Sequence, residues 1–183
     1  MDIRTLQDQI AETTEAGAMP PVEKWHPDFC GDLNLVIKKN GQWWHEGTPF
    51  TRASLIKLFA SVIKKEGNDY FLVTPVEKLG IVVEDVPFIA IDDDFVAQPN
   101  GDTFIEITTS CGDKVRIGKD HPIELREFDN NPVPYCLIRR NLWARVHQNV
   151  LYRWVENAHA LTINHENALV LNSGDYEFVI GYY

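Results

Sequence analysis

Several side chains able to bind an anion or transfer a proton lie within the string HEGTPFTR, at positions 45 to 52. They include His45, Glu46, Thr48 and Arg52. Hydroxyl and backbone N–H groups at the start of a helix can hold an anion, and the helix dipole disfavours a cation there. We therefore expect Arg52 to have a negative partner. That partner is either an anionic ligand or a carboxylate of the chain, Glu46 or Glu77.

A second basic cluster lies in the string RRNLWAR, which holds Arg139, Arg140 and Arg145. Read as one strand, the even separation of Arg139 and Arg145 places them on one face, with Arg140 on the other. These arginines either bind the same anion as Arg52 or carry the charges that protect an edge strand from aggregation.

Motifs of common catalytic and metal sites are absent from the sequence. It contains neither of the glycine-rich phosphate loops, no G-x-S-x-G and no H-E-x-x-H. The run from Asp92 to Asp94 lacks the spacing of a calcium loop and is expected to be a solvated linker. The cysteines Cys30, Cys111 and Cys136 are odd in number and widely spaced, which disfavours disulfides and zinc. We expect neither a metal nor a cofactor.

Length and composition indicate a folded protein without a membrane segment. The chain has 183 residues, 44% of them hydrophobic, which suffices for one large domain or two small ones. Its net charge of −10 makes nucleic acid an unfavourable partner. The acidic, amphipathic start is unlike a signal peptide, and no apolar run reaches the ~20 residues that cross a bilayer. We expect a cytoplasmic protein that does not insert into membranes.

Apolar residues at helical spacing predict three helices. The first spans residues 3–15 and is ended by Gly17. The second carries an apolar stripe from Leu55 to Ile63 and is ended by Gly67, and the third covers 148–158.

Turn residues between β-branched and aromatic runs predict hairpins at 40–41, 111–113 and 173–175. The charged, turn-rich segment 92–102 predicts a domain boundary. We therefore expect an N-terminal helix within 1–20, a first unit at 21–93 and a second at 94–183.

Two segments of the chain resemble each other. LVIKKNGQW at 35–43 and CLIRRNLW at 136–143 both have two apolar residues, two basic residues, an asparagine and then a tryptophan, and a helix follows each. This echo predicts an α+β fold made by duplication, with two related units of curved antiparallel sheet plus one helix. Chance similarity between two ordinary hairpins is the alternative.

The segment 43–78 also resembles a bacterial family, domain of unknown function 1285. The resemblance rests on Trp43, the run 45–49, Arg52, the run 58–60 and the run 72–78. It implies a duplicated α+β fold whose C-terminal unit is similar to a pleckstrin-homology-like curved sheet with a helix. It implies no activity, and it suggests a ligand or partner site at the junction of the units, with a signalling role. Around Asn141 and 148–149 the chain departs from the family pattern.

We interpret the chain as a cytoplasmic ligand-binding or regulatory module with a small anionic molecule or peptide held between the two units. Arginines supply charge, hydroxyls supply hydrogen bonds, and Glu77 orients Arg52. The expected ligand-binding residues are His45, Glu46, Thr48, Arg52, Thr74, Glu77, Arg139 and Arg145.

Two other functions remain open. One is an enzyme in which His45 works as acid and base with Glu46 or Glu77, which requires a histidine and a carboxylate within hydrogen-bond reach. The other is a protein–protein adaptor that uses an exposed apolar patch in the C-terminal run YEFVIGYY.

Overall fold

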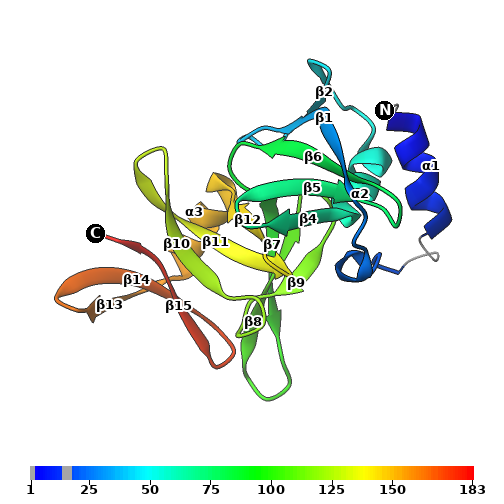
Figure 1. Ribbon diagram of the computed structural model, residues 1–183. Coiled ribbons are helices and arrows are strands. Elements are labelled where there is room, and N and C mark those ends of the chain that lie inside the picture. The colour runs from blue at the N-terminus through cyan, green and yellow to red at the C-terminus, as the bar shows by residue number, and fades with distance from the viewer. Residues whose placement is uncertain (1–2, 14–17) are drawn as a thin grey trace. The chain divides into compact units, whose positions relative to one another are not determined.

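The computed structural model describes residues 3–13 and 18–183, and its chain divides after Pro87 into two compact units. Unit 1 ends at Pro87 and unit 2 begins at Phe88. The boundary expected at 92–102 falls instead within unit 2, because those residues belong to a long hairpin (Figure 1). Each unit is described by itself below.

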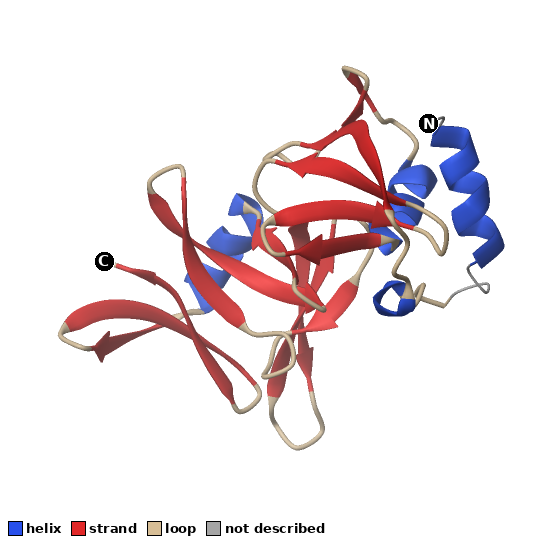
Figure 2. Ribbon diagram, in the orientation of Figure 1, coloured by secondary structure: helices blue, strands red, loops and turns tan. Residues whose placement is uncertain are grey.

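Unit 1 is a six-stranded curled sheet with two helices (Figures 1 and 2). The strands lie in the order β3-β2-β1-β6-β5-β4, and β1 and β6 are parallel whereas the other pairs are antiparallel. In chain order its elements are α1 (Ile3–Thr13), the 3-10 turn η1 (Val22–Lys24), β1 (Phe29–Ile37), β2 (Trp43–His45), β3 (Thr48–Pro49), α2 (Ala53–Ser61), β4 (Ile63–Glu66), β5 (Asp69–Val73) and β6 (Lys78–Val83).

The core of unit 1 follows the alternation of its strands. Leu33, Leu35 and Ile37 of β1 are buried, whereas Asp32 and Asn34, which precede Leu33 and Leu35, are exposed. A strand places successive side chains on opposite faces, so one face of the sheet forms the core and the other is open. The core side chains of α2, Phe59 and Ala60, are also buried.

Helix α1 confirms the first predicted helix over the residues that are described, and it packs on α2 (Figure 1). Its Leu6 and Ile10 are fully buried, as their spacing requires. Residues 14 and 15 of the expected helix, and the expected stop at Gly17, lie outside the described residues.

The second predicted helix is shorter than expected. Helix α2 ends at Ser61, and strand β4 begins at Ile63, where β-branched residues favour a strand. Gly67 has φ +59 and turns the hairpin between β4 and β5, so it does not cap a helix. A glycine soon after two lysines is compatible with both a helix end and a hairpin turn. The local sequence therefore does not distinguish between these two structures.

Unit 2 has a second six-stranded sheet, one helix and a three-stranded sheet (Figure 2). The larger sheet has the order β10-β11-β12-β7-β8-β9, and the smaller has the order β13-β14-β15. Its elements are β7 (Phe88–Ala97), β8 (Thr103–Thr109), β9 (Lys114–Arg116), β10 (Ile123–Phe128), β11 (Asn131–Arg139), β12 (Leu142–Val146), α3 (Gln148–Asn157), β13 (His159–Ile163), β14 (Glu166–Ser173) and β15 (Tyr176–Tyr182).

The two large sheets share one topology, so the α+β duplication is confirmed. Each consists of two three-stranded meanders, and the first strand of one meander pairs in parallel with the last strand of the other. The sheets are therefore mixed rather than purely antiparallel. The echo at 35–43 lies on the first hairpin of unit 1, whereas the echo at 136–143 lies on the last hairpin of the large sheet in unit 2. The similar strings thus hold different places in the shared topology.

Helix α3 joins the two sheets of unit 2. It contacts β7 in the large sheet and both β14 and β15 in the small one. Trp154 is fully buried and packs edge-on against Phe178 of β15, with ring centroids 5.6 Å apart. None of the described helices combines the length and apolarity needed to cross a bilayer.

Candidate functional site

The HEGTP string forms a tight hairpin. His45 at the end of β2 pairs with Thr48 at the start of β3, so Glu46 and Gly47 form a two-residue turn with φ values of 48° and 76°. Such positive φ values at both turn positions match the twist of a hairpin, and glycine is favoured in the second. Glu46 and Thr48 are exposed at this tip.

His45 packs as an aromatic ring. It stacks on Phe50 with centroids 5.9 Å apart and planes 17° from parallel, and Phe50 in turn contacts Phe59 at 6.1 Å. Within residues 3–13 and 18–183, no carboxylate hydrogen-bonds to His45. The acid–base pair with Glu46 or Glu77 is therefore not assembled in this structure.

Arg52 stands at the N-cap of α2 with extended backbone angles, φ −90° and ψ 104°. Its side chain is exposed, and α2 has no side-chain cap. In the described part of the chain Arg52 has no ion pair, so neither of its expected internal partners, Glu46 and Glu77, is bound.

Thr74 and Glu77 lie together in the turn between β5 and β6. The Thr74 hydroxyl donates to Gln9 Oε1 of α1 at 3.1 Å and accepts the Glu77 backbone N–H at 3.1 Å. Thr74 is fully buried, so its hydroxyl fixes the turn and docks α1. Glu77 Oε2 is buried and has no hydrogen-bond partner among the described residues.

The RRNLWAR string is also a hairpin, not the single strand expected. Strand β11 ends at Arg139, β12 begins at Leu142, and Arg140 between them has φ +54. Arg145 lies on β12, where its guanidinium stacks 3.8 Å from the centroid of Phe128. Because Arg139 and Arg145 lie on different strands, their even spacing in the sequence does not place them on one face of a strand.

Arg139 is paired inside unit 2. Its guanidinium contacts the Asp113 carboxylate and lies 4.6 Å from the centroid of Phe88. Burial, together with the neighbouring Arg140 charge, lowers the pKa of Arg139 to about 10. Since that value is far above neutral pH, the ion pair with Asp113 persists under physiological conditions.

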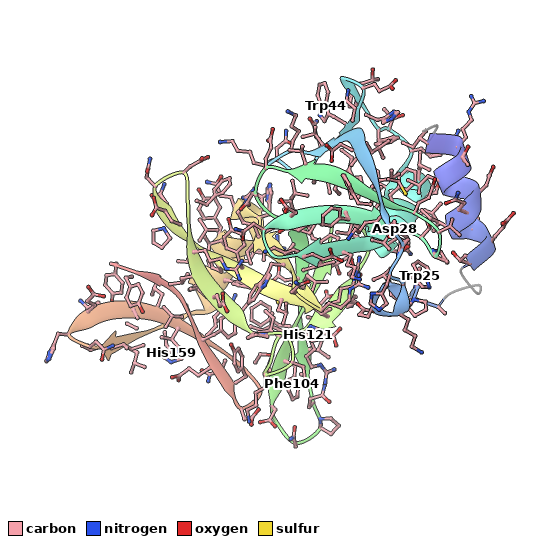
Figure 3. All side chains as sticks on the ribbon, in the orientation of Figure 1. Trp25, Asp28, Trp44, Phe104, His121 and His159 are labelled. Atoms are coloured by element: carbon pink, nitrogen blue, oxygen red, sulfur yellow. The ribbon has the colours of Figure 1, made fainter. Side chains whose placement is uncertain are left out.

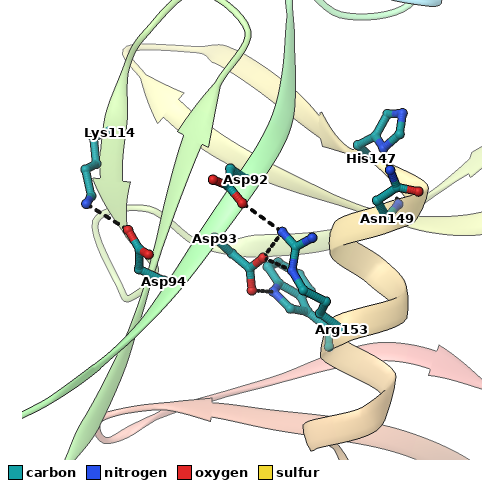
Figure 4. Close-up of polar contacts among 8 residues, drawn as sticks. Asp92, Asp93, Asp94, Lys114, His147, Asn149 and Arg153 are labelled. Atoms are coloured by element: carbon teal, nitrogen blue, oxygen red, sulfur yellow. Dashed lines mark hydrogen bonds and ion pairs between the residues drawn. The ribbon is translucent and has the colours of Figure 1, made fainter.

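The three aspartates of the expected linker belong to strand β7, where Asp92 and Asp93 bind Arg153 and Asp94 binds Lys114 (Figure 4). The Asp93 side chain is 1% exposed and accepts Arg153 Nε at 2.6 Å and Trp154 Nε1 at 3.2 Å. Asp92 accepts from Arg153 Nη2 at 3.0 Å, and Asp94 pairs with Lys114 at 3.0 Å. The run is thus part of a folded sheet, and the linker prediction is wrong.

Groups of three or more metal-ligating side chains do not occur among the described residues. The cysteines carry free thiols, with Cys30 exposed and Cys111 and Cys136 buried.

A groove on the open face of the unit 1 sheet brings together side chains that the sequence did not single out. It has a volume of about 450 Å³. Figure 3 shows all described side chains on the ribbon and labels Asp28, the residue before β1. The lining residues are Phe29 and Asp32 of β1, Asp69, Tyr70 and Phe71 of β5, and Lys78, Gly80 and Ile81 of β6.

Gly80 forms the floor of this groove. It pairs with Asp32 across the parallel β1–β6 ladder and with Phe71 across the antiparallel β5–β6 ladder. A Cβ at position 80 would lie 2.2 Å from Asp32 Oδ1 and 3.5 Å from the Phe29 ring. The missing side chain therefore gives the carboxylate its place over the sheet.

Two phenylalanines and a lysine form the wall. Phe29 and Phe71 meet edge to face with centroids 6.2 Å apart. Lys78 Nζ lies 5.0 Å from the centroid of Phe71 and 3.0 Å from Glu66 Oε2. The hydrogen bond from Lys78 lowers the pKa of Glu66 below its ordinary value, against a smaller opposing effect of burial.

Two acidic side chains complete the groove. Asp32 and Asp69 are exposed, and neither carboxylate has a hydrogen-bond or ion-pair partner in the described residues. A sequence signal for the groove did exist. Phe71 alternates with the buried Tyr70 and Leu72, which puts a large aromatic ring on the open face of the sheet.

The C-terminal run is partly buried. Phe178 and Ile180 of β15 belong to the core of unit 2, whereas Tyr182 and Tyr183 are exposed. A smaller hollow of about 310 Å³ lies beside β15 and β10. The Tyr176 hydroxyl at this hollow accepts the Ile123 backbone N–H at 3.1 Å.

Comparison with known proteins identifies relatives over most of the chain. The model for the N-terminal domain of a domain of unknown function, DUF1285, matches residues 20–86, and the model for the C-terminal domain matches residues 87–180. The boundary between these matches adjoins the division after Pro87. No curated protein matches the chain.

Two solved structures are similar to this chain. The crystal structure of a DUF1285 family protein from Silicibacter pomeroyi DSS-3 has 32% identity and a TM-score of 0.82, covering 94% of this chain and 92% of that one. The crystal structure of a DUF1285 family protein from Shewanella baltica OS155 has 30% identity and a TM-score of 0.54, covering 68% of this chain and 91% of that one. With both family domains and these structures in agreement, the chain belongs to the DUF1285 family.

Proposed function

We propose that the protein is a ligand-binding or regulatory module, and that the groove of unit 1 binds a small molecule or a peptide segment. The observation that carries this proposal is a hollow of about 450 Å³ walled by Phe29 and Phe71 on the open face of the sheet. Binding sites are typically concave, aromatic and supplied with a few polar groups. The cytoplasmic location and the signalling role expected from the sequence form part of the proposal.

A binding role is favoured over catalysis by the state of the candidate acid–base groups. The His45 ring is stacked on Phe50 without a carboxylate bonded to it among the described residues, and Glu46 forms the turn of the hairpin. A general acid or base needs a reachable proton-transfer partner. These side chains instead support the local fold.

An anionic ligand, as expected from the sequence, is the second candidate. It is favoured by Arg52, an exposed cation without an ion pair among the described residues, at a helix start that has no side-chain cap. Backbone N–H groups of the first turn can add hydrogen bonds to an anion there. That the ligand lies between the two units, and that unit 2 is pleckstrin-homology-like, stay predictions.

Thermal melting of the full chain against a panel of compounds tests the proposal. The panel contains anionic metabolites, nucleotides, phosphopeptides, aromatic compounds and amines. A ligand that binds only the folded state raises the melting midpoint. At a hundredfold excess over Kd, it adds about 2.7 kcal/mol to the free energy of unfolding.

Two variants locate any ligand that is found. Phe71→Leu alters the groove wall and keeps an apolar side chain on the sheet, whereas Arg52→Ala removes the cation at α2. A ligand of the groove loses its effect in the first variant and keeps it in the second. If no compound raises the midpoint, the proposal of a binding module fails.

A further inference from the structure

We infer that the groove of unit 1 accepts a positively charged group, an ammonium or guanidinium borne by a short alkyl chain. This inference rests on the proposed function and adds the chemical class of the ligand. It also opposes the anionic ligand expected from the sequence, because the groove and the start of α2 are different surfaces of unit 1.

The charge balance of the groove is the first argument. Lys78 and Lys64 are both bound to Glu66, at 3.0 Å and 3.4 Å, so each has a partner. The carboxylates of Asp32 and Asp69 have none among the described residues. The charged side chains that line the groove are two aspartates and Lys78, so the lining has a net charge of −1, and the charges without a partner are both negative. A cationic guest would neutralise them.

The aromatic wall is the second argument. Lys78 Nζ already lies 5.0 Å from the Phe71 centroid while it binds Glu66, so one ammonium is held between a ring and a carboxylate on this face. The ring of Phe29 lies edge to face with that of Phe71, with centroids 6.2 Å apart, and Phe29 is 55% exposed. A guest cation can therefore contact the Phe29 ring and the Asp32 carboxylate in the same way.

The third argument is the placement of Asp32. Only a glycine at position 80 leaves room for Asp32 Oδ1, which lies 2.2 Å from where a Cβ would be. Gly80 is not in the left-handed backbone region, so alanine fits its backbone. Gly80→Ala therefore displaces the Asp32 carboxylate while leaving the charge of the protein unchanged. Its effect on binding shows whether the position of the carboxylate matters as well as its charge.

Calorimetric titration of the full chain tests the inference with defined probes. The cationic probes are Nα-acetylarginine amide, Nα-acetyllysine amide and the peptide Ala-Arg-Ala with acetylated and amidated ends. The matched uncharged probes are Nα-acetylcitrulline amide, Nα-acetylnorleucine amide and Ala-citrulline-Ala with the same blocked ends. We expect binding of the charged probes only, and weakening with added salt because the carboxylates are exposed. Binding of the single-residue amides indicates a small cationic molecule, and binding of the peptide alone indicates a basic segment of a partner.

Charge-neutral variants assign the binding to the groove. The double variant Asp32→Asn/Asp69→Asn should weaken binding about tenfold or more, which corresponds to ~1.4 kcal/mol. Gly80→Ala should also weaken it. The control Glu12→Gln/Glu166→Gln removes two exposed carboxylates outside the groove and should bind like the parent protein. Circular dichroism and melting confirm that each variant is folded.

The outcomes separate this inference from the proposed function. Equal binding of the uncharged probes, or unchanged binding by the Asp32→Asn/Asp69→Asn variant, overturns the inference. If the charged probes fail but another compound raises the midpoint and loses that effect in Phe71→Leu, the groove is a binding site and only the cationic class is wrong. If the probes and the whole panel fail, both proposals fall.

Discussion

The indole N–H of Trp154 donates to Asp93 Oδ2 at 3.2 Å and thereby joins helix α3 to strand β7. Trp154 is fully buried, and the Asp93 side chain is 1% exposed, so water cannot replace either partner. Arg153, which is 43% exposed, neutralises the carboxylate from the solvent side. A buried carboxylate thus acts as the anchor of a helix.

Asp93→Ala should destabilise unit 2 by about 2–3 kcal/mol, because the buried Trp154 N–H would lose its acceptor. Arg153 would recover water and limit the loss. The matched control is Asp94→Ala, whose ion pair with Lys114 is more than half exposed, so its loss should have a much smaller effect. Urea unfolding with hydrogen-exchange mass spectrometry reports each unit separately. Equal effects of the two substitutions would contradict the anchor role.

Two glycines with the same backbone angle provide a second test. Gly67 and Gly174 both have φ +59, but a Cβ at Gly174 would lie 2.4 Å from the Phe104 ring, whereas a Cβ at Gly67 would meet nothing within 4 Å. Gly67→Ala should cost about 1–2 kcal/mol from backbone strain alone. Gly174→Ala should cost more, because Phe104 must also move. Chemical denaturation of both variants measures the difference, and equal losses would show that the ring moves without cost.

The cysteines should differ sharply in reactivity. Burial raises the pKa of Cys111 to about 11 and that of Cys136 to about 12, whereas Cys30 is exposed. The thiolate is the reactive form, so native protein at mildly alkaline pH should be alkylated at Cys30 alone. Mass spectrometry after iodoacetamide treatment counts the labels, and denatured protein serves as the control. Rapid labelling of Cys136 in the native state would show that its surroundings open readily.

The Glu66–Lys78 pair should make a small contribution to acid stability. Lys78 lowers the pKa of Glu66 below its ordinary value of 4.5 in the folded state. The stabilisation by the ion pair is therefore fully present above pH 4.5. It is lost as the pH falls through the lower pKa of Glu66 in the folded state. Since Glu66 is 41% exposed, the loss should stay below about 1 kcal/mol. In Glu66→Gln, the free energy of unfolding should fall by that much less between neutral and acid pH. Glu166→Gln should show the same pH dependence as the parent protein.

Local sequence signals predicted most elements but not their pairing. The hairpin at Asn40 and Gly41 and the helix at 148–157 depend on neighbouring residues, and both are present. The parallel pairing of β1 with β6 joins residues far apart in the chain, and no local pattern encodes it. The segment around Asp93 has the local composition of a linker, whereas the partners that make it part of the fold, Arg153 and Trp154, lie about sixty positions away.

The candidate groove was missed for a related reason. Reactive residue types that are adjacent along the chain, such as His45 and Glu46, predict a local site, but these two residues form the end of a strand and a hairpin turn. The groove takes its side chains from three strands whose order is set by the sheet. The alternation that puts Phe71 outward was readable, but its neighbours across the sheet were not.

The parallel pairing of first and last strands has a consequence for synthesis of the chain. As unit 1 emerges from the ribosome, β1 has one hydrogen-bonding edge without a partner until β6 has been made. Unit 2 has the same requirement for β7 and β12. Each half must therefore be complete before its sheet can close, and nascent chains halted inside a unit would present an open strand edge to chaperones.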